Sequence, residues 1–198
     1  MARGGLRLAL RWLEGALFIG ALACVTWLGV TWGHATLYQL YAKNEMDRLA
    51  TPGLPAVGMP AASLSTHDSL IGVLAIPNVG LSVAVVEGDD ARALRIAAGH
   101  LPDTPLPWET GNSAIAGHRD TFFRVLERVR GGDELSLATR RGTLRYRVVA
   151  VSVVAPDDLS VLGTSTNADL TLITCYPFHY VGPAPRRFIV QAQRISLP

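Results

Sequence analysis

The sequence predicts a mostly β fold: a closed β-barrel of about eight strands with short helices, preceded by one N-terminal transmembrane helix. Two observations support this. Short runs rich in β-branched and apolar residues recur after about residue 68, separated by turns that contain Pro or Gly, with only short helical patterns between them. Strands this frequent favour a closed, mostly antiparallel barrel over a doubly wound sheet. Before them lies one uncharged apolar run that is long enough to cross a bilayer.

Composition limits the classes of partner. The 198 residues carry a formal net charge of only +2, which argues against a nucleic-acid-binding surface, so we expect no nucleic-acid partner. Hydrophobic residues make up 49% of the chain, enough for a real core. Lys43 is the only lysine, so the globular part offers no amine for a Schiff base or a general base.

The apolar run at residues 15–42 contains no Asp, Glu, Lys or Arg and predicts a transmembrane anchor after a short cytoplasmic N-terminus, residues 1–14. Arginines precede the run and mixed charges follow it. The positive-inside rule therefore predicts a single pass through the cytoplasmic membrane, with the N-terminus inside and the remaining chain extracytoplasmic. A cleaved signal peptide is the alternative, because Ala21-Leu22-Ala23 matches a cleavage pattern. Its place in the middle of the run favours an uncleaved anchor, with the lipid bilayer as a partner.

The next segment, residues 43–67, predicts a stalk and linker. Residues 43–50 are polar enough to continue the helix as a stalk, and residues 51–67 contain three prolines and two glycines among small residues. The globular domain then covers residues 68–198, a normal size for a single domain.

Alternation and turn residues define the elements of this domain. Pro-Asn-Val-Gly at 77–80 and the Arg-Arg-Gly segment at 140–142 supply turns between strand-like runs. Asp89 or Asp90 is suited to begin a short helix, and Gly99 to end it. In order, we expect strands at 70–76 and 81–88, a helix at 89–99, a strand at 112–118, a helix at 121–129, a hairpin within 131–154, a loop or short helix at 157–163, and strands at 168–175 and 186–197.

Cys175 follows the strand-like run Thr171–Thr174 and is the candidate nucleophile. Cys24 lies inside the apolar run, so we expect no disulfide and a free thiol at Cys175. A small buried core residue is the alternative for this position. However, Ser, Ala or Val would pack nearly as well without exposing a thiol to an oxidising compartment, which favours a reactive role.

A thiol nucleophile needs a base and a donor for the developing oxyanion. His118 ends a predicted strand just before a predicted helix, and it is the candidate base. His67 lies in the expected linker and His179 in the loop after the cysteine, so we expect neither to act. His100 lies between a helix end and a proline-rich loop, where a structural or supporting role near the site is expected.

The donor is expected at Arg186 or Arg187, which open a strand that follows the cysteine strand after a ten-residue connection. Successive strands joined in this way are often antiparallel neighbours, which places the start of one close to the end of the other. Side chains alternate between the two faces of a strand, so only one of the two arginines can face Cys175. Periodicity does not decide which one.

Four segments between residues 70 and 195 occur in an order that resembles a known family. They are IGVLAIPNVGLSVAVVEG, NSAIAGHRDTFF, TLITC and, after an arginine, RFIV. Together with the N-terminal anchor they resemble the sortases, membrane-anchored cysteine transpeptidases of bacterial surfaces, and HRDTFF and CYPFHYVGPAPRRFIV are similar to the class D group. On this resemblance the catalytic residues are His118, Cys175 and Arg187, with Arg186 as the fallback.

The resemblance implies a cysteine transpeptidase or peptidase that cuts an LPXTG-like sorting signal between Thr and Gly. Cys175 would attack the Thr carbonyl and form a thioacyl enzyme, His118 would transfer protons, and Arg187 would hold the peptide and stabilise the oxyanion. The implied partners are a protein that carries the sorting signal and an amine acceptor, either a cell-wall precursor or a pilin. No cofactor is expected.

Supporting residues are less sharply defined. Thr174 and Asp120 are candidates to orient Cys175 and His118, although a plain strand residue and a helix cap explain them equally well. Acidic residues of the domain are scattered without the spacing of a calcium loop, so we expect no metal site. Two other functions stay open: a thiol peptidase that passes the acyl group only to water, and a catalytically silent, membrane-anchored β-domain that binds a partner through its loops.

Overall fold

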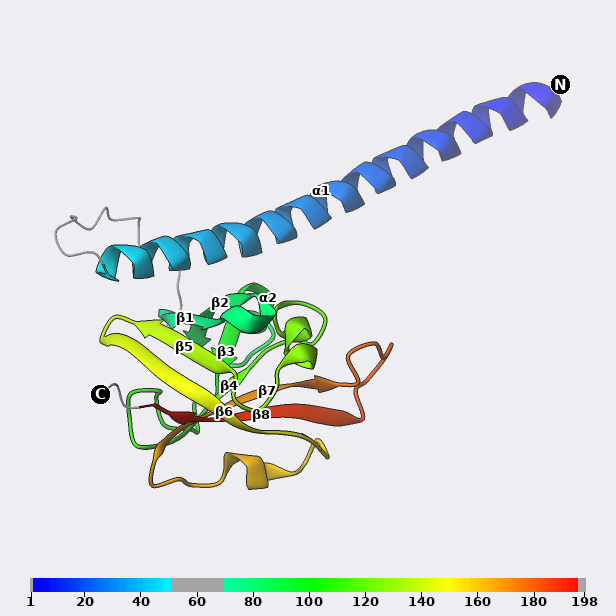
Figure 1. Ribbon diagram of the computed structural model, residues 1–198. Helices are drawn as coiled ribbons and strands as arrows, with labels where there is room; N and C mark the ends of the chain where they lie inside the picture. Colours follow the sequence, from blue (N-terminus) through cyan, green and yellow to red (C-terminus); the bar gives the residue numbers. More distant parts are fainter. Residues whose placement is uncertain (1, 51–69, 196–198) are drawn as a thin grey trace. The chain divides into compact units, whose positions relative to one another are not determined.

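The computed structural model describes residues 2–50 and 70–195 (Figure 1). The chain divides into two compact units, Met1–Leu37 and Tyr38–Pro198. The expected linker at 51–67 lies outside the described residues.

The N-terminal segment is a single helix, α1 (Ala2–Ala50). Its stretch Arg11–Asp47 is long and apolar enough to cross a membrane, and the segment predicted as an anchor, residues 15–42, lies within it. The helix continues through residues 43–50, as expected for a helical stalk.

The globular part is a closed barrel of eight strands, which confirms the predicted fold class. The strands are β1 (Leu70–Ile76), β2 (Leu81–Glu87), β3 (Ala98–His100), β4 (Gly111–Ala116), β5 (Glu134–Thr139), β6 (Gly142–Val154), β7 (Ala168–Tyr176) and β8 (Arg186–Arg194). The short helices are η2 (Pro77–Val79), α2 (Ala93–Ile96), η3 (Phe122–Arg128) and η4 (Leu159–Leu162). Around the barrel the strands follow the order β1-β2-β3-β4-β7-β8-β6-β5.

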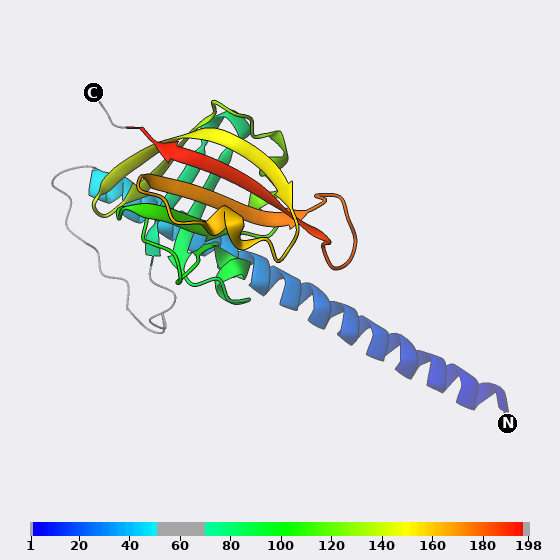
Figure 2. The ribbon, with the colours of Figure 1, turned by 90° about the horizontal axis from the view of Figure 1, so that it is seen from below.

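Most neighbouring strands are antiparallel, as predicted, but two pairs are parallel. These are β2 with β3 and β4 with β7. The second pair places the ends of β4 and β7 on the same edge of the sheet. Figure 2 shows β4, β7, β8 and β6 side by side, and this part of the barrel carries the candidate site.

The helix predicted at 89–99 is much shorter in the structure, and a strand follows it. Only Ala93–Ile96 is helical, and the backbone becomes extended at Ala97, with φ −150° and ψ 177°. The residues that follow form β3, because there they can pair with the backbone of β2. Gly99 does not end a helix. It allows close approach, since a Cβ atom there would lie 2.2 Å from the carbonyl oxygen of Gly88.

The other elements agree closely with the pattern. The hairpin expected within 131–154 is formed by β5 and β6, and the helix expected at 121–129 is the 3₁₀ helix η3. The strand expected at 112–118 ends at Ala116, two residues before His118. Alternate residues of each strand fill the barrel; on β7 these include Leu170 and Leu172, while the intervening side chains lie on the outer face.

Candidate active site

Cys175 and Arg187 lie directly opposite each other on the antiparallel strands β7 and β8, and Tyr176 lies opposite Arg186. Residues directly opposite on antiparallel strands share a face of the sheet, with Cα atoms about 4.5–5.5 Å apart. Arg187 is therefore on the same face as Cys175, whereas Arg186 is on the other. The sequence alone left open which of the two arginines shares a face with Cys175, and the register of β7 and β8 places Arg187 there.

His118 comes to the same edge from the other side of β7. In the parallel pair of β4 and β7, Ala116 lies opposite Ile173, and the Gly117 N–H donates to the carbonyl oxygen of Ile173 over 3.1 Å. Two residues beyond this pair lie His118, just past the end of β4, and Cys175, which is still on β7. Three neighbouring strands therefore bring His118, Cys175 and Arg187 to one level, and all three are partly exposed.

Thr174 connects the backbone next to Cys175 with the backbone next to His118 through a side-chain hydrogen bond. Its hydroxyl donates to the carbonyl oxygen of Gly117 over 2.7 Å, and both residues are buried. This bond joins the residue before Cys175 to the residue before His118. Glycine is required at 117 because a Cβ atom there would lie 2.7 Å from the ring of Phe123. The segment that leads into His118 is thus packed closely against η3.

Arg119 was not recognised as a site residue from the sequence. Its guanidinium donates to the carbonyl oxygens of Pro177 (3.1 Å) and Gly182 (2.9 Å), and its Cζ lies 5.8 Å from the centre of the Tyr180 ring. Both carbonyls belong to the loop between Cys175 and β8. Arg119 directly follows His118, the candidate base, and its side chain therefore links this part of the chain to the loop after Cys175, the candidate nucleophile. A charged side chain directly beside a candidate base is the signal that could have identified it.

The Arg187 guanidinium donates to backbone carbonyls at and just before the start of β8. Nη1 donates to the carbonyl oxygens of Arg186 (3.1 Å) and Ala184 (3.4 Å). Within residues 2–50 and 70–195, no carboxylate forms an ion pair with it. A guanidinium has five N–H donors, so this side chain retains donors for an oxygen beside the thiol.

Aromatic side chains hold the end of the cysteine strand. The rings of Tyr176, Phe178 and Phe188 form a cluster with centroid separations of 5.0–6.2 Å, and the two phenylalanines are buried. Offset and edge-to-face contacts of this kind add packing energy to apolar burial. They support the backbone on which Cys175 and Arg187 are placed.

His100 belongs to a separate buried contact. It is only 1% exposed; its Nδ1 lies 3.1 Å from Oε2 of Glu87, and its Nε2 lies 3.0 Å from the carbonyl oxygen of Pro105. Its hydrogen-bond partners are on β2 and on the loop between β3 and β4. The structure thus places His100 where it joins that loop to the barrel, and among the described residues neither His118 nor Cys175 is a hydrogen-bond partner of its ring.

The remaining candidates lie on the surface. Asp120 is exposed, and in the part of the chain that the structure describes its carboxylate has no hydrogen-bond partner. His179 is 64% exposed and lies 3.3 Å from a carboxylate oxygen of Glu127, as expected for a surface loop histidine. The described residues contain no group of three or more His, Cys, Asp and Glu side chains that could hold a metal ion.

Two side chains away from the site have shifted pKa values. Burial raises the pKa of Tyr146 to about 12, against an opposing effect of Arg194, and the Tyr146 hydroxyl donates to the carbonyl oxygen of Pro107. Hydrogen bonds from the side chain and backbone of Ser160 lower the pKa of Asp158, the residue that caps the N-terminus of η4.

Comparison with known proteins agrees with this geometry. Residues 74–195 match the sortase domain family. Sortase D of Bacillus subtilis strain 168 is 39% identical over 126 residues, which cover 63% of this chain and 64% of that protein, so the match spans less than two thirds of that relative's length.

Solved structures of sortases resemble the barrel. A sortase D5 transpeptidase of Clostridium perfringens superposes with a TM-score of 0.59 at 29% identity, over 64% of this chain and 79% of that chain. Sortase A of Corynebacterium diphtheriae gives a TM-score of 0.62 at 26% identity, over 83% and 85% of the two chains. The family match covers more than half of the residues and includes His118, Cys175 and Arg187. The chain therefore belongs to the sortase family.

Proposed function

We propose that this protein is a cysteine transpeptidase that cleaves an LPXTG-like sorting signal after Thr and transfers the acyl group to an amine. The observation that carries the proposal is the strand register: Cys175 lies opposite Arg187, and His118 reaches the same level from β4. This juxtaposition supplies a nucleophile, a donor for an oxyanion and a group that transfers protons.

In the first half of the reaction, the Cys175 thiolate attacks the carbonyl carbon of the substrate Thr. The C–S bond forms as the carbonyl becomes a tetrahedral oxyanion. When the oxyanion collapses, the C–N bond to Gly breaks, and protonated His118 gives its proton to the leaving amine. The products are a thioester on Cys175, neutral His118 and a released peptide that begins with Gly.

In the second half, an amine attacks the thioester carbonyl. Neutral His118 takes the proton from the attacking nitrogen, the new C–N bond forms, and the C–S bond breaks to regenerate the Cys175 thiolate. The same histidine therefore acts first as an acid and then as a base, and no net proton is gained or lost.

Arg187 is assigned to the oxyanion and to the substrate backbone. Its position on the same face as Cys175 and the donors that it retains support this role. Thr174 and Arg119 are assigned as positioning residues, because one bonds the strand ends to each other and the other holds the loop after Cys175.

We also propose a membrane location for the reaction. The candidate span in α1 is consistent with a membrane-anchored sortase. The arginines before the apolar run support an N-terminus in the cytoplasm, a single pass and a catalytic domain outside the cytoplasmic membrane. The partners are then a secreted protein that carries the sorting signal, and an amine on a cell-wall precursor or on a pilin.

Mass spectrometry tests the activity directly. The full chain in detergent micelles is incubated with a panel of LPXTG-like peptides, with and without an amine such as triglycine. We expect a thioacyl adduct on Cys175 and, with the amine, a product extended by it. Cys175→Ala should form no adduct, and Cys24→Ser is the matched control that should retain activity.

Two outcomes would contradict the proposal. Absence of an adduct with every peptide of the panel would exclude the thioacyl mechanism. Cleavage with the same hydrolysed product at every amine concentration would identify a thiol peptidase that uses only water as its acceptor.

A further inference from the structure

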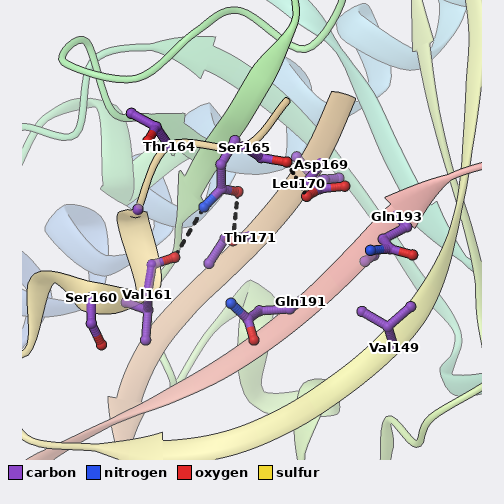
Figure 3. A pocket seen from close by; sticks show the side chains of 13 residues that line it. Val149, Ser160, Val161, Thr164, Ser165, Asp169, Leu170, Thr171, Gln191 and Gln193 are labelled. Carbon is purple, nitrogen blue, oxygen red and sulfur yellow. Dashed lines mark hydrogen bonds between the residues drawn. The ribbon is translucent and has the colours of Figure 1, made fainter. Parts of the chain in front are cut away.

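A polar pocket of about 350 Å³ lies on the outer face of β7 and β8, next to the loop that contains η4 (Figure 3). It is separate from Cys175 and is not used by the mechanism above. Its polar lining includes Asn112, Ser165, Asp169, Thr171, Gln191 and Gln193.

The pocket and the candidate active site share one face of the sheet. Thr171 and Asp169 precede Cys175 on β7 by four and six residues, so alternation places all three on the same face. At about 3.3 Å per residue they lie roughly 13 and 20 Å from the level of the thiol. Gln191 lies opposite Thr171, and Gln193 lies opposite Asp169.

One wall of the pocket is held by Asn112. Its side chain donates to the carbonyl oxygen of Val161 (3.0 Å) and accepts from the hydroxyl of Thr171 (2.7 Å); in Figure 3 these bonds are the dashed lines that end at the labelled Val161 and Thr171. The loop with η4 is thereby tied to β4 and β7. Because both ends of the Asn112 amide are occupied, this residue shapes the pocket and leaves binding to other side chains.

The remaining polar groups have unused hydrogen-bonding capacity. One carboxylate oxygen of Asp169 accepts from Ser165 over 2.6 Å, and the other is buried without a partner among the described residues. The carboxamides of Gln191 and Gln193, which extend from β8 in Figure 3, form no side-chain hydrogen bond within the described part of the chain. Each offers both donors and an acceptor.

These features favour an extended peptide as the occupant. Among the described residues no aromatic ring lines the pocket, so a sugar or a nucleobase would find no surface there on which to stack. The two glutamines are spaced by two residues, about 6.6 Å, which is the repeat of an extended peptide backbone. In the part of the chain that the structure describes, Asp169 is the only ionisable residue of the lining, so side chains that donate hydrogen bonds are favoured over acidic ones.

We propose that this pocket binds the substrate residues that immediately precede the LPXTG-like motif. Leu, Pro, X and Thr of an extended motif cover about 13 Å from the thiol, the distance to Thr171, so the preceding residues reach the pocket. Gln191 and Gln193 bind their backbone, and Asp169 selects a donor side chain such as Lys. This inference rests on the proposed transpeptidase function and adds a specificity site to it.

Peptides of different length test the inference. The full chain in detergent micelles is assayed with a capped LPXTG-like peptide, the same peptide preceded by Ser-Lys, and the same peptide preceded by Glu-Glu. We expect the Ser-Lys extension to raise kcat/KM about tenfold through KM, and the Glu-Glu extension to give no gain. In the double variant Gln191→Ala/Gln193→Ala, kcat/KM for the Ser-Lys peptide divided by kcat/KM for the short peptide should be close to one.

Charge selection is tested with Asp169→Asn, which should reduce the preference for Ser-Lys over Glu-Glu at least threefold. Thr143→Ala, an exposed substitution on β6, is the matched control. It should retain the wild-type preference for the Ser-Lys peptide over both the short peptide and the Glu-Glu peptide. Thermal melting of each variant confirms that it folds. Equal kcat/KM for the three peptides in the wild-type chain, or ratios that survive in the variants, would overturn the proposal.

A binding measurement separates this inference from the proposed function. Fluorescence anisotropy with labelled short and extended peptides, on the Cys175→Ala chain, reports affinity without turnover. A tighter Kd for the Ser-Lys peptide supports the pocket even where no peptide of the panel is cleaved. Equal Kd values for the short and extended peptides would overturn the pocket while leaving the transpeptidase proposal intact.

Discussion

The hydroxyl of Thr174 and the carbonyl oxygen of Gly117 are joined by a hydrogen bond of 2.7 Å in the buried part of the barrel. Each residue directly precedes a catalytic candidate, Cys175 in one case and His118 in the other. The bond supplements the backbone ladder between β4 and β7 at the point where both strands end. It therefore constrains the relative position of Cys175 and His118.

Replacing Thr174 by Val keeps the shape of the side chain but removes the hydroxyl. The Gly117 carbonyl then loses a buried donor, which should lower the free energy of unfolding by about 1–3 kcal/mol and reduce kcat. Denaturant unfolding and peptide cleavage measure the two effects. Thr174→Ser, which retains the hydroxyl, should recover most of both, and equal losses in the Ser and Val variants would show that the hydroxyl is not responsible.

Arg119 should affect catalysis more than stability. Arg119→Gln removes the guanidinium that donates to the carbonyl oxygens of Pro177 and Gly182. The loop after Cys175 then loses two charge-assisted hydrogen bonds, and kcat should fall about tenfold. Kinetics should show a larger change in kcat than in KM, and the rate at which iodoacetamide alkylates Cys175 should change.

The matched control for Arg119 is Arg124→Gln. Arg124 contacts the exposed His179 and lies on η3, so its loss should leave kcat within about twofold of the wild type. Identical kinetics for the two variants would show that the Arg119 bonds do not position the site.

Replacing each of the two arginines at the start of β8 by Ala should have very different effects on kcat/KM. Arg187→Ala removes the guanidinium on the same face as Cys175 and should lower kcat/KM about a hundredfold, as expected for the loss of an oxyanion donor. Arg186→Ala, on the opposite face, should stay within about threefold of the wild type. Cleavage assays on both variants compare them, and a larger loss for Arg186→Ala would reverse the assignment.

Tyr146 predicts a stability change at high pH. Its pKa is raised to about 12 by burial, whereas a tyrosine in the unfolded chain ionises near pH 10. Between these values the unfolded state binds fewer protons, so the free energy of unfolding falls as the pH rises. The stabilising contribution is complete below pH 10 and is lost towards pH 12, by up to roughly 3 kcal/mol.

Urea unfolding of the wild type at pH 9 and pH 11 measures this loss. Tyr146→Phe should remove most of the difference between the two pH values, although it also lowers stability at pH 9 by leaving the Pro107 carbonyl without its donor. Tyr180→Phe is the control at an exposed tyrosine and should retain the wild-type pH dependence. The same pH dependence in the wild type and in Tyr146→Phe would contradict the assignment.

Local patterns of sequence predicted most of the barrel correctly. Alternation and turn residues located β1, β2, the hairpin of β5 and β6, β7 and β8 to within a few residues, since each of these runs has its own period and punctuation. The strand β3 was missed because three residues, Ala98–His100, carry no period. They become a strand only through the partner that β2 provides.

The types of the candidate catalytic residues were also visible in the sequence. An unpaired Cys175 at a strand end, a histidine at another strand end and an arginine pair at the start of a third strand are local features, and motif order connected them to a family. The sequence alone therefore determined the candidate membrane-spanning helix, the barrel and the residue types of the candidate site, because hydrophobic period and chain order are properties of neighbouring residues.

Only the tertiary structure decided how these residues meet. The register of β7 and β8 places Arg187, and not Arg186, opposite Cys175, the parallel pairing of β4 and β7 places His118 and Cys175 at neighbouring strand ends, and the Arg119 contacts span more than fifty residues of chain. The pocket beside Gln191 and Asp169 likewise joins strands and a loop. Register and long-range hydrogen bonds depend on which strands become neighbours when the barrel closes, and no local pattern encodes that choice.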